Sequence, residues 1–201
     1  MKKIISFSIF ILLCFSSFSQ KTGTLTDVRD NKVYKTVKIG DQWWMSENLA
    51  YKPNSGNFWT YEDNEKNVPI YGYLYDFKTA ENICPTGWHI PNNDEWEVLS
   101  EYLGGWNVAG GKMKEEKYAH WQSPNTDATN KSGFTALPGG YVEVLSEKNV
   151  YIYIGQYGFW WSSSYGGTSY MLFYEAACIA KPGGAIYITK YDGLSVRCIK
   201  D

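Results

Sequence analysis

The side chains of this chain that could do chemistry are a small set of carboxylates, histidines and cysteines. Asp94 and Glu95 are adjacent, as are Glu115 and Glu116, and a glycosidase uses two carboxyl groups that face each other across a sugar. Asp94 and Glu95 instead fit the first turn of a helix, where the helix dipole stabilises acidic side chains. Glu115 and Glu116 lie in a lysine-rich segment typical of a solvated surface. We therefore predict no glycosidase site and no catalytic residues.

The two histidines, His89 and His120, lie far apart in the sequence. Neither has a cysteine or a second histidine at the spacing that zinc sites use. His89 lies between Trp88 and Ile90 in a turn, and we expect its ring to be hydrogen-bonded within that turn. The sequence therefore predicts no metal site and no cofactor.

The beginning of the chain has the features of a secretory signal peptide. A basic start precedes an apolar run at residues 4–15 and small residues follow, so we expect residues 1–19 to be removed by cleavage before Gln20. The run is too short for a comfortable membrane span, and no second one follows. Cys14 raises the alternative of a lipid anchor, although Leu13 stands where a small residue is expected. We predict a secreted or cell-surface protein without a membrane span.

Export changes how the cysteines are interpreted, because compartments outside the cytoplasm favour disulfides. Cys84, Cys178 and Cys198 lie after the signal segment, and three thiols allow three different pairs. We favour Cys84 with Cys198, because both lie at the edges of recognisable elements. Cys178 has small apolar neighbours and is expected to be a buried free thiol, since a reactive thiolate needs cationic surroundings.

Charge and aromatic content restrict the partners. Charged residues make up 20% of the 201 residues, and the formal net charge is −2. This balance lacks the basic footprint that nucleic acids and acidic membranes attract, so no nucleic-acid partner is predicted. Aromatic residues reach 17%, and every tyrosine and tryptophan follows residue 20. Such rings serve hydrophobic cores and binding surfaces equally well.

Two short helices are expected to position these side chains. Pro91 prevents an earlier start, Asn92 is a good N-cap, and Glu95 stands at the capping-box position of a helix over residues 93–103. A shorter helix is predicted in the second half of residues 71–83. Residues 104–129 have no apolar period that would support a long element.

Strands account for most of the remaining chain. Residues 20–31 form a polar lead-in, and residues 32–201 are predicted to be a single domain. After a first hairpin and the helices, the strands are expected to form an antiparallel meander. The predicted strands are residues 32–39, 42–49, 133–141, 150–154, 159–164, 170–179, 185–189 and 194–199.

Seven sequence blocks together resemble a known family. They are Trp43-Trp-Met-Ser-Glu-Asn-Leu49, Gly72-Tyr-Leu-Tyr75, Cys84-Pro-Thr-Gly-Trp-His-Ile-Pro91, Glu95-Trp96, Phe134-Thr-Ala-Leu-Pro-Gly-Gly140, Trp160-Trp-Ser-Ser-Ser164 and Ser195-Val-Arg-Cys198. In this order they are similar to the Fibrobacter succinogenes major paralogous domain over roughly residues 25–200. The resemblance implies an exported bacterial protein with an α+β, C-type lectin-like fold of two short helices, antiparallel sheets and long irregular loops. It also implies a disulfide between Cys84 and Cys198, but no established activity.

Two chemistries of related folds can be compared with these residues. Sugar-binding C-type lectins hold Ca²⁺ with a Glu-Pro-Asn or Gln-Pro-Asp loop and a Trp-Asn-Asp strand, because calcium needs several converging oxygens. Here the strand reads Trp161-Ser-Ser-Ser164 and no such loop precedes it, so a calcium site is not expected. The formylglycine-generating oxidases use a reactive cysteine pair, which would be Cys178 and Cys198. That pairing would leave Cys84 alone, and fold similarity does not by itself carry chemistry.

The remaining hypothesis is a non-catalytic domain that binds an extracellular glycan or a surface protein. In lectin-like folds the long loops and final strands form an exposed face, and tyrosine and tryptophan offer rigid contact area there. The candidate ligand-binding residues are Tyr157, Trp160, Trp161, Tyr165, Tyr170, Tyr174, Tyr187 and Tyr191.

Neighbouring side chains on a strand point in opposite directions, so one of Trp160 and Trp161 is expected in the core. Tyr165 and Tyr170 are the better surface candidates. The alternative is a structural or adhesive surface module whose rings all serve packing.

Overall fold

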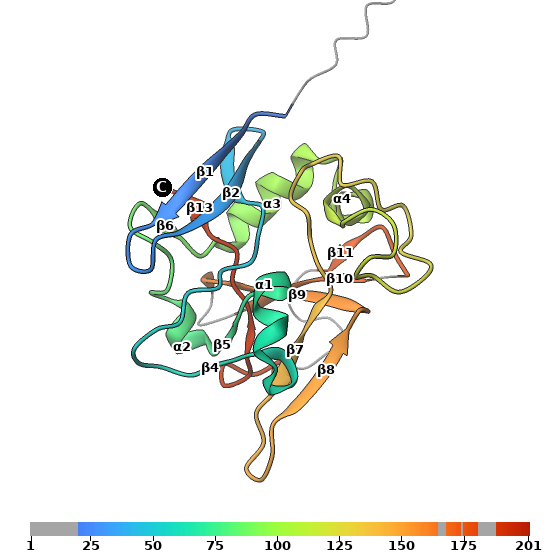
Figure 1. The fold of residues 1–201 in the computed structure, drawn as a ribbon. Helices are drawn as coiled ribbons and strands as arrows, with labels where there is room; N and C mark the ends of the chain where they lie inside the picture. Colours follow the sequence, from blue (N-terminus) through green and yellow to red (C-terminus); the bar gives the residue numbers. More distant parts are fainter. Residues whose placement is uncertain (1–19, 165–167, 174, 181–187) are drawn as a thin grey trace, which may run out of the picture.

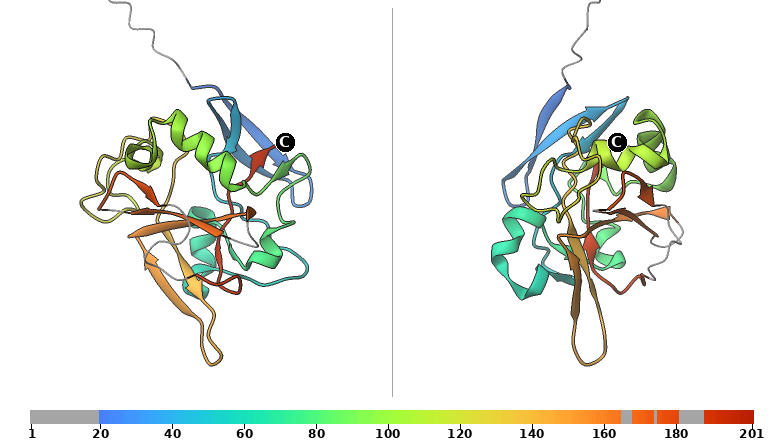
Figure 2. Two further views of the ribbon diagram at one scale, coloured as in Figure 1. Left: turned by 180° about the vertical axis from the view of Figure 1, so that it is seen from behind. Right: turned by 90° about the vertical axis from the view of Figure 1, so that its right-hand side faces the viewer.

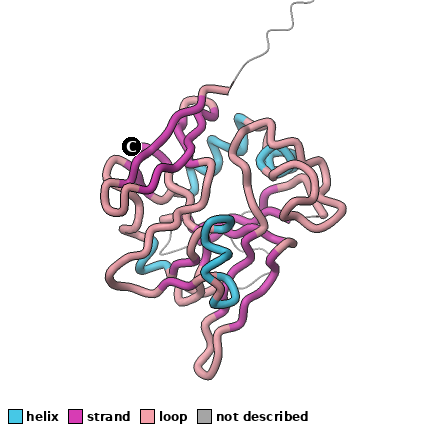
Figure 3. The backbone as a smooth tube through the Cα atoms, viewed as in Figure 1, coloured by secondary structure: helices cyan, strands magenta, loops and turns pink. Residues whose placement is uncertain are grey.

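The protein has a mixed α+β fold with few, short helices (Figure 1). The computed structural model describes residues 20–164, 168–173, 175–180 and 188–201. The α-helices of the described part are α1 (Val68–Tyr71), α2 (Phe77–Ala80), α3 (Asn93–Tyr102) and α4 (Trp106–Met113), and two 3-10 helices, η1 (Tyr61–Asp63) and η2 (Glu65–Asn67), precede α1. The predicted α+β class is therefore confirmed, and Figure 3 shows how much of the remaining chain is loop.

The first sheet has the strand order β1-β2-β3-β13-β6, and every pairing in it is antiparallel. The predicted hairpin is present, and its turn contains Gly40, whose φ of 59° suits a residue without a Cβ. Residues 22–27, expected to be lead-in, instead form an edge strand on β2. The strands are β1 (Thr22–Asp27), β2 (Lys32–Ile39), β3 (Gln42–Met45), β6 (Trp88–His89) and β13 (Ile199–Lys200).

The second sheet corrects the expected meander. It contains β4 (Phe58–Trp59), β5 (Leu74–Tyr75), β7 (Gly139–Glu143), β8 (Val150–Ile154), β9 (Tyr157–Ser162), β10 (Thr168–Phe173), β11 (Ile179–Ala180) and β12 (Leu194–Ser195). Its central strand β9 pairs antiparallel with β10 but parallel with β7 and β12. The predicted strand over residues 194–199 is split, because β12 joins this sheet and β13 joins the first one. The final residues therefore tie the two sheets together (Figure 2).

Helix α3 forms as its sequence predicts. The side chain of Asn92 accepts from the backbone N–H of Glu95 at 2.9 Å, and the Glu95 carboxylate accepts from the backbone N–H of Asn92 at 2.8 Å. Trp96 and Leu99 are buried on its inner face. This capping box fixes where the helix begins.

Helix α4 was not predicted. Its buried residues are Ala109, Gly110, Gly111 and Met113. Three of these four have small or no side chains, so the sequence lacks the regular spacing of large apolar residues that predicts a helix. A Cβ at Gly110 would lie 2.3 Å from the carbonyl oxygen of Cys178, which shows how closely this helix approaches that segment. The missing hydrophobic signal is the consequence of this close backbone packing.

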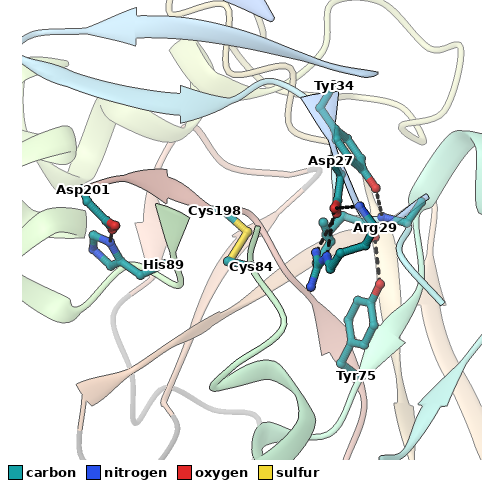
Figure 4. The surroundings of a disulfide bond; sticks show 10 residues. Asp27, Arg29, Tyr34, Tyr75, Cys84, His89, Cys198 and Asp201 are labelled. Atoms are coloured by element: carbon teal, nitrogen blue, oxygen red, sulfur yellow. Dashed lines mark hydrogen bonds and ion pairs between the residues drawn. A yellow bond between two sulfur atoms is a disulfide. The ribbon is translucent and has the colours of Figure 1, made fainter. Parts of the chain in front are cut away.

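A disulfide joins Cys84 and Cys198 (Figure 4), as predicted, with their Cα atoms 6.0 Å apart. Cys84 follows α2, and Cys198 is fully buried just before β13. The bond therefore ties the end of α2 to the start of β13, the C-terminal strand. Cys178 is a free, partly buried thiol. No helix in the described part of the chain is long and apolar enough to cross a membrane.

Candidate functional site: a polar cleft above a buried arginine

Arg197 and Asn48 form a buried hydrogen-bonded pair. Arg197 is fully buried, and its Nε and Nη2 donate to Oδ1 of Asn48 at 3.1 and 2.7 Å. The same oxygen accepts from the indole Nε1 of Trp160 at 2.9 Å. Nδ2 of Asn48 donates in turn to the backbone carbonyl of Tyr71 at 2.9 Å and to Oγ of Ser195 at 3.2 Å. Both ends of this amide are therefore satisfied without water.

Arg197 also holds the segment that contains Phe134. Its Nη1 donates to the backbone carbonyls of Phe134 and of Met45, the latter at 3.3 Å. The guanidinium carbon lies 4.3 Å from the centre of the Phe134 ring, a cation–π contact. Burial lowers the pKa of Arg197 to about 9, against an opposing field from Glu47. One charged side chain thus joins segments from both ends of the domain.

A cleft of about 430 Å³ lies beside this pair. It is bordered by β2, the end of β3, α1 and the long segment after α4. Its lining residues are Lys32, Val33, Tyr34, Lys35, Ser46, Glu47, Asn48, Val68, Pro69, Ile70, Gly72, Glu115, His120, Thr135 and Leu137. Charged, hydrogen-bonding and apolar groups therefore line one cavity, a mixture that is typical of a ligand site.

Thr135 borders this cleft in a strained backbone conformation. Its φ of 53° is the left-handed region, which a β-branched residue rarely adopts. The side chain of Asn130 fixes it from two directions, because Oδ1 accepts from the Thr135 N–H at 2.9 Å and Nδ2 donates to Oγ1 at 3.0 Å. Strain that the surroundings hold in place occurs preferentially at functional sites.

Two carboxylates, each held by a hydrogen bond, provide part of the polar lining of the cleft. The carboxylate of Glu115 binds Nδ1 of His120 at 2.9 and 3.0 Å, and the imidazole packs edge-on against the Tyr71 ring, 5.8 Å between centres. On the other side, Glu47 accepts from the backbone N–H of Lys35 at 2.9 Å. The His120 ring is therefore held in one orientation, with Nε2 making no hydrogen bond among the described residues.

The sequence does not predict these cleft residues: Glu115 is expected on a solvated surface, and His120 is not expected to bind a metal. The detectable signal was the two blocks that contain Glu47 and Thr135, which form part of the family resemblance. Neither block carries a recognisable catalytic pattern. Only the folded chain shows that Glu47 and Thr135 line the same cleft.

Three of the eight predicted aromatic site residues lie in the core. Trp160, Trp161 and Tyr170 are 0%, 1% and 2% exposed. Trp160 and Trp161 do point in opposite directions, but β9 is covered on both faces, so each indole enters a different apolar cluster. Tyr170 stacks on Trp96 with ring centres 4.9 Å apart. A ligand at the surface does not reach these rings.

Two of the other predicted rings, Tyr157 and Tyr191, lie in the described structure. Tyr157 is partly buried and packs edge-on against Phe173, whereas Tyr191 is 64% exposed. Tyr165, Tyr174 and Tyr187 lie outside the described residues.

The remaining chemical candidates are held in structural interactions. His89 bonds through Nδ1 to Asp201 at 2.6 Å (Figure 4). Through Nε2 it bonds to Glu95 at 2.9 Å, so its partners lie outside its own turn. Cys198 is bonded to Cys84 and is not a thiol that could act with Cys178. The described residues contain no group of three or more cysteines, histidines or carboxylates placed to hold a metal ion.

These features define a class: a disulfide-linked α+β domain in which a buried arginine supports an open polar cleft. The model of the Fibrobacter succinogenes major domain matches residues 37–200, and the chain belongs to this family. The predicted family is therefore confirmed. No curated protein and no solved structure matches the chain.

Proposed function

We propose that this protein is an exported, non-catalytic binding domain with a C-type lectin-like fold. Its ligand, an extracellular glycan or a segment of a surface protein, would occupy the cleft between β2, α1 and Thr135. The observation that carries the proposal is the cleft itself, about 430 Å³ of mixed polar and apolar lining that rests on the Asn48–Arg197 pair.

The lining favours a glycan over a peptide. Glu47 can accept from sugar hydroxyls, and Lys35 and His120 can donate to them. The exposed side chains of Val33 and Ile70, 55% and 42% accessible, offer apolar contact for the C–H faces of a sugar ring. A saccharide presents both hydroxyl groups and apolar C–H faces, so it can use the polar and the apolar lining groups together.

Rigidity of the site supports binding as its role. The Asn48–Arg197 bonds and the Asn130–Thr135 bonds hold the walls before a ligand arrives. A preformed site loses less conformational entropy on binding than a flexible one. A rigid cleft can therefore give useful affinity with few contacts.

The contacts of His120 favour binding over nucleophilic catalysis. Its hydrogen bonds go to Glu115, and no hydroxyl or thiol in the described part of the chain bonds to the ring. An activated nucleophile needs such a bond to its base. Export follows from the predicted signal peptide at residues 1–19, which lie outside the described structure.

A glycan array tests this proposal. The secreted protein is applied with and without a chelator, and hits are measured by calorimetry with the variants Glu47→Gln and His120→Ala. We expect each variant to weaken binding about tenfold, the loss of one to two hydrogen bonds. The chelator should change nothing, because no calcium site is proposed.

Glu147→Gln is the matched control, because it removes the same charge from an exposed loop outside the cleft. Equal affinity in the control and cleft variants, at unchanged unfolding free energy, would reject the cleft as the site. Absence of any glycan hit together with retention of a surface protein would select the peptide ligand instead.

A structural or adhesive module is the second candidate. The burial of Trp160, Trp161 and Tyr170 favours it, because these rings serve packing. Under this alternative neither glycan nor protein is retained, and the cleft variants behave as wild type in every binding assay.

A further inference from the structure

A second cleft lies where the turn after β2 meets the end of α3. Its volume is about 370 Å³, and three lysines, Lys21, Lys38 and Lys131, line it. The chain as a whole has a formal net charge of −2, so this concentration of ammonium groups is local and not a property of the composition.

Two of these lysines have no carboxylate partner. Lys38 pairs with Asp41 at 3.1 Å, but that carboxylate is fully exposed to solvent. Neither Lys21 nor Lys131 forms a salt bridge in the part of the chain that the structure describes, and Nζ of Lys21 lies 5.7 Å from the centre of the Trp43 ring. The backbone carbonyl of Lys21 accepts from the N–H of Lys38 at 2.8 Å. This hydrogen bond fixes the position of the Lys21 backbone beside β2.

An exposed aromatic ring forms one wall of this cleft. Tyr102, at the end of α3, is 66% exposed, yet its ring rests on the turn at Gly40. A Cβ at Gly40 would lie 3.1 Å from Cδ2 of that ring, and the φ of 59° at Gly40 already disfavours other residues. The tyrosine is therefore held in place while most of its surface remains available.

We infer that this cleft binds an acidic saccharide, with the ammonium groups of Lys21 and Lys131 contacting its carboxylates or sulfates and the Tyr102 ring contacting a sugar face. A ring beside these cations suits a charged sugar, since a neutral glycan offers Lys21 and Lys131 no carboxylate or sulfate. The negative net charge of the chain disfavours nucleic acid, whose affinity depends on many phosphate contacts. This site is separate from the cleft beside Asn48.

The test compares two ligands of the same sugar sequence, one with charged carboxylates and one with neutral methyl esters. Binding of an oligogalacturonate and of its fully methyl-esterified, uncharged form is measured by calorimetry on the protein secreted from the full chain with a C-terminal tag. We expect the acid to bind and the ester not to bind. Added salt should weaken the acid's binding, because exposed charges are screened.

Matched variants locate the site. Lys21→Gln with Lys131→Gln should weaken binding of the acid about tenfold, the sum of two exposed charge contacts. Lys66→Gln with Lys148→Gln changes the net charge equally at exposed positions elsewhere and should leave affinity unchanged. Tyr102→Ala should weaken the acid's binding, and Tyr102→Phe should retain it.

Three results would overturn the inference. One is equal binding of the ester and the acid, and another is the same loss in the control pair as in the cleft pair. The third is binding of duplex DNA as tightly as the acid with no effect of Tyr102→Ala, which would indicate a general polyanion surface. The variants Glu47→Gln and His120→Ala should bind the acid normally, so failure of the first cleft leaves this test intact.

Discussion

The guanidinium of Arg197 and the amide of Asn48, 149 residues apart in the sequence, form a two-point hydrogen bond in the core. Asn48→Ala would leave Arg197 and the Trp160 indole without their shared acceptor. We expect a loss of about 3 kcal/mol in unfolding free energy, the cost of breaking a buried charged network on one side. Urea denaturation measures this loss.

The exposed loop variant Asn54→Ala is the control for that measurement and should change stability by less than about 0.5 kcal/mol. A similarly small change in Asn48→Ala would mean that the pair contributes little to the fold.

The disulfide spans 114 positions, so its removal enlarges the unfolded ensemble considerably. Cys84→Ala combined with Cys198→Ala should lower the unfolding free energy by roughly 4–5 kcal/mol on the chain-entropy model. Denaturation with and without reductant measures this, and the double variant should be insensitive to reductant. Cys178→Ala should keep the reductant response. Equal stability of the double variant and the wild type would refute the prediction.

His89 makes the stability of the domain depend on pH. Burial alone would lower its pKa, but the hydrogen bonds that the ring donates to the Asp201 and Glu95 carboxylates outweigh burial and raise the pKa above its ordinary value. The folded state therefore holds the proton more tightly than the unfolded state. This contribution is fully present below the unfolded pKa of about 6.5 and is lost as pH rises through the folded pKa.

Screening limits the effect to less than about 1 kcal/mol, because the His89 side chain is 39% exposed. Urea denaturation between pH 5 and pH 9, a range of about four units around that unfolded pKa, compares the wild type with His89→Gln. The variant should lose stability at the acidic end only. An identical pH profile for both proteins would contradict the role given to His89.

Thr135→Gly separates strain from function. Glycine adopts a φ of 53° without penalty, so removal of the strain should offset the loss of the bond from Asn130 to Oγ1. We expect stability within about 1 kcal/mol of wild type, and weaker binding of any ligand of the first cleft. Calorimetry and denaturation on one protein sample report both quantities. Unchanged ligand affinity in this variant would show that Thr135 serves the fold alone.

The aromatic residues predicted to bind a ligand differ in role. Trp160→Ala should cost about 3–5 kcal/mol, because it removes a fully buried indole from a packed cluster. Tyr191→Ala should cost less than about 0.5 kcal/mol, since that ring is 64% exposed. Denaturation compares the two, and similar losses would contradict this division.

The sequence by itself determined the features that depend on neighbouring residues. Asn92 and Glu95 lie within one turn of each other, so their capping box and the start of α3 are visible in the sequence. The turn at Gly40 likewise follows from local conformational freedom, and the family blocks were sufficient to assign the family and to pair Cys84 with Cys198.

Only the tertiary structure decided which faces are covered and which side chains meet. Trp160 and Trp161 obey the alternation of a strand, but alternation does not reveal that β9 is covered on both sides. The cleft requires Glu47 and Thr135 to be brought together by Arg197, whose partners lie 62 to 152 residues away. Contacts over such separations depend on how the whole chain packs, and no local pattern encodes them.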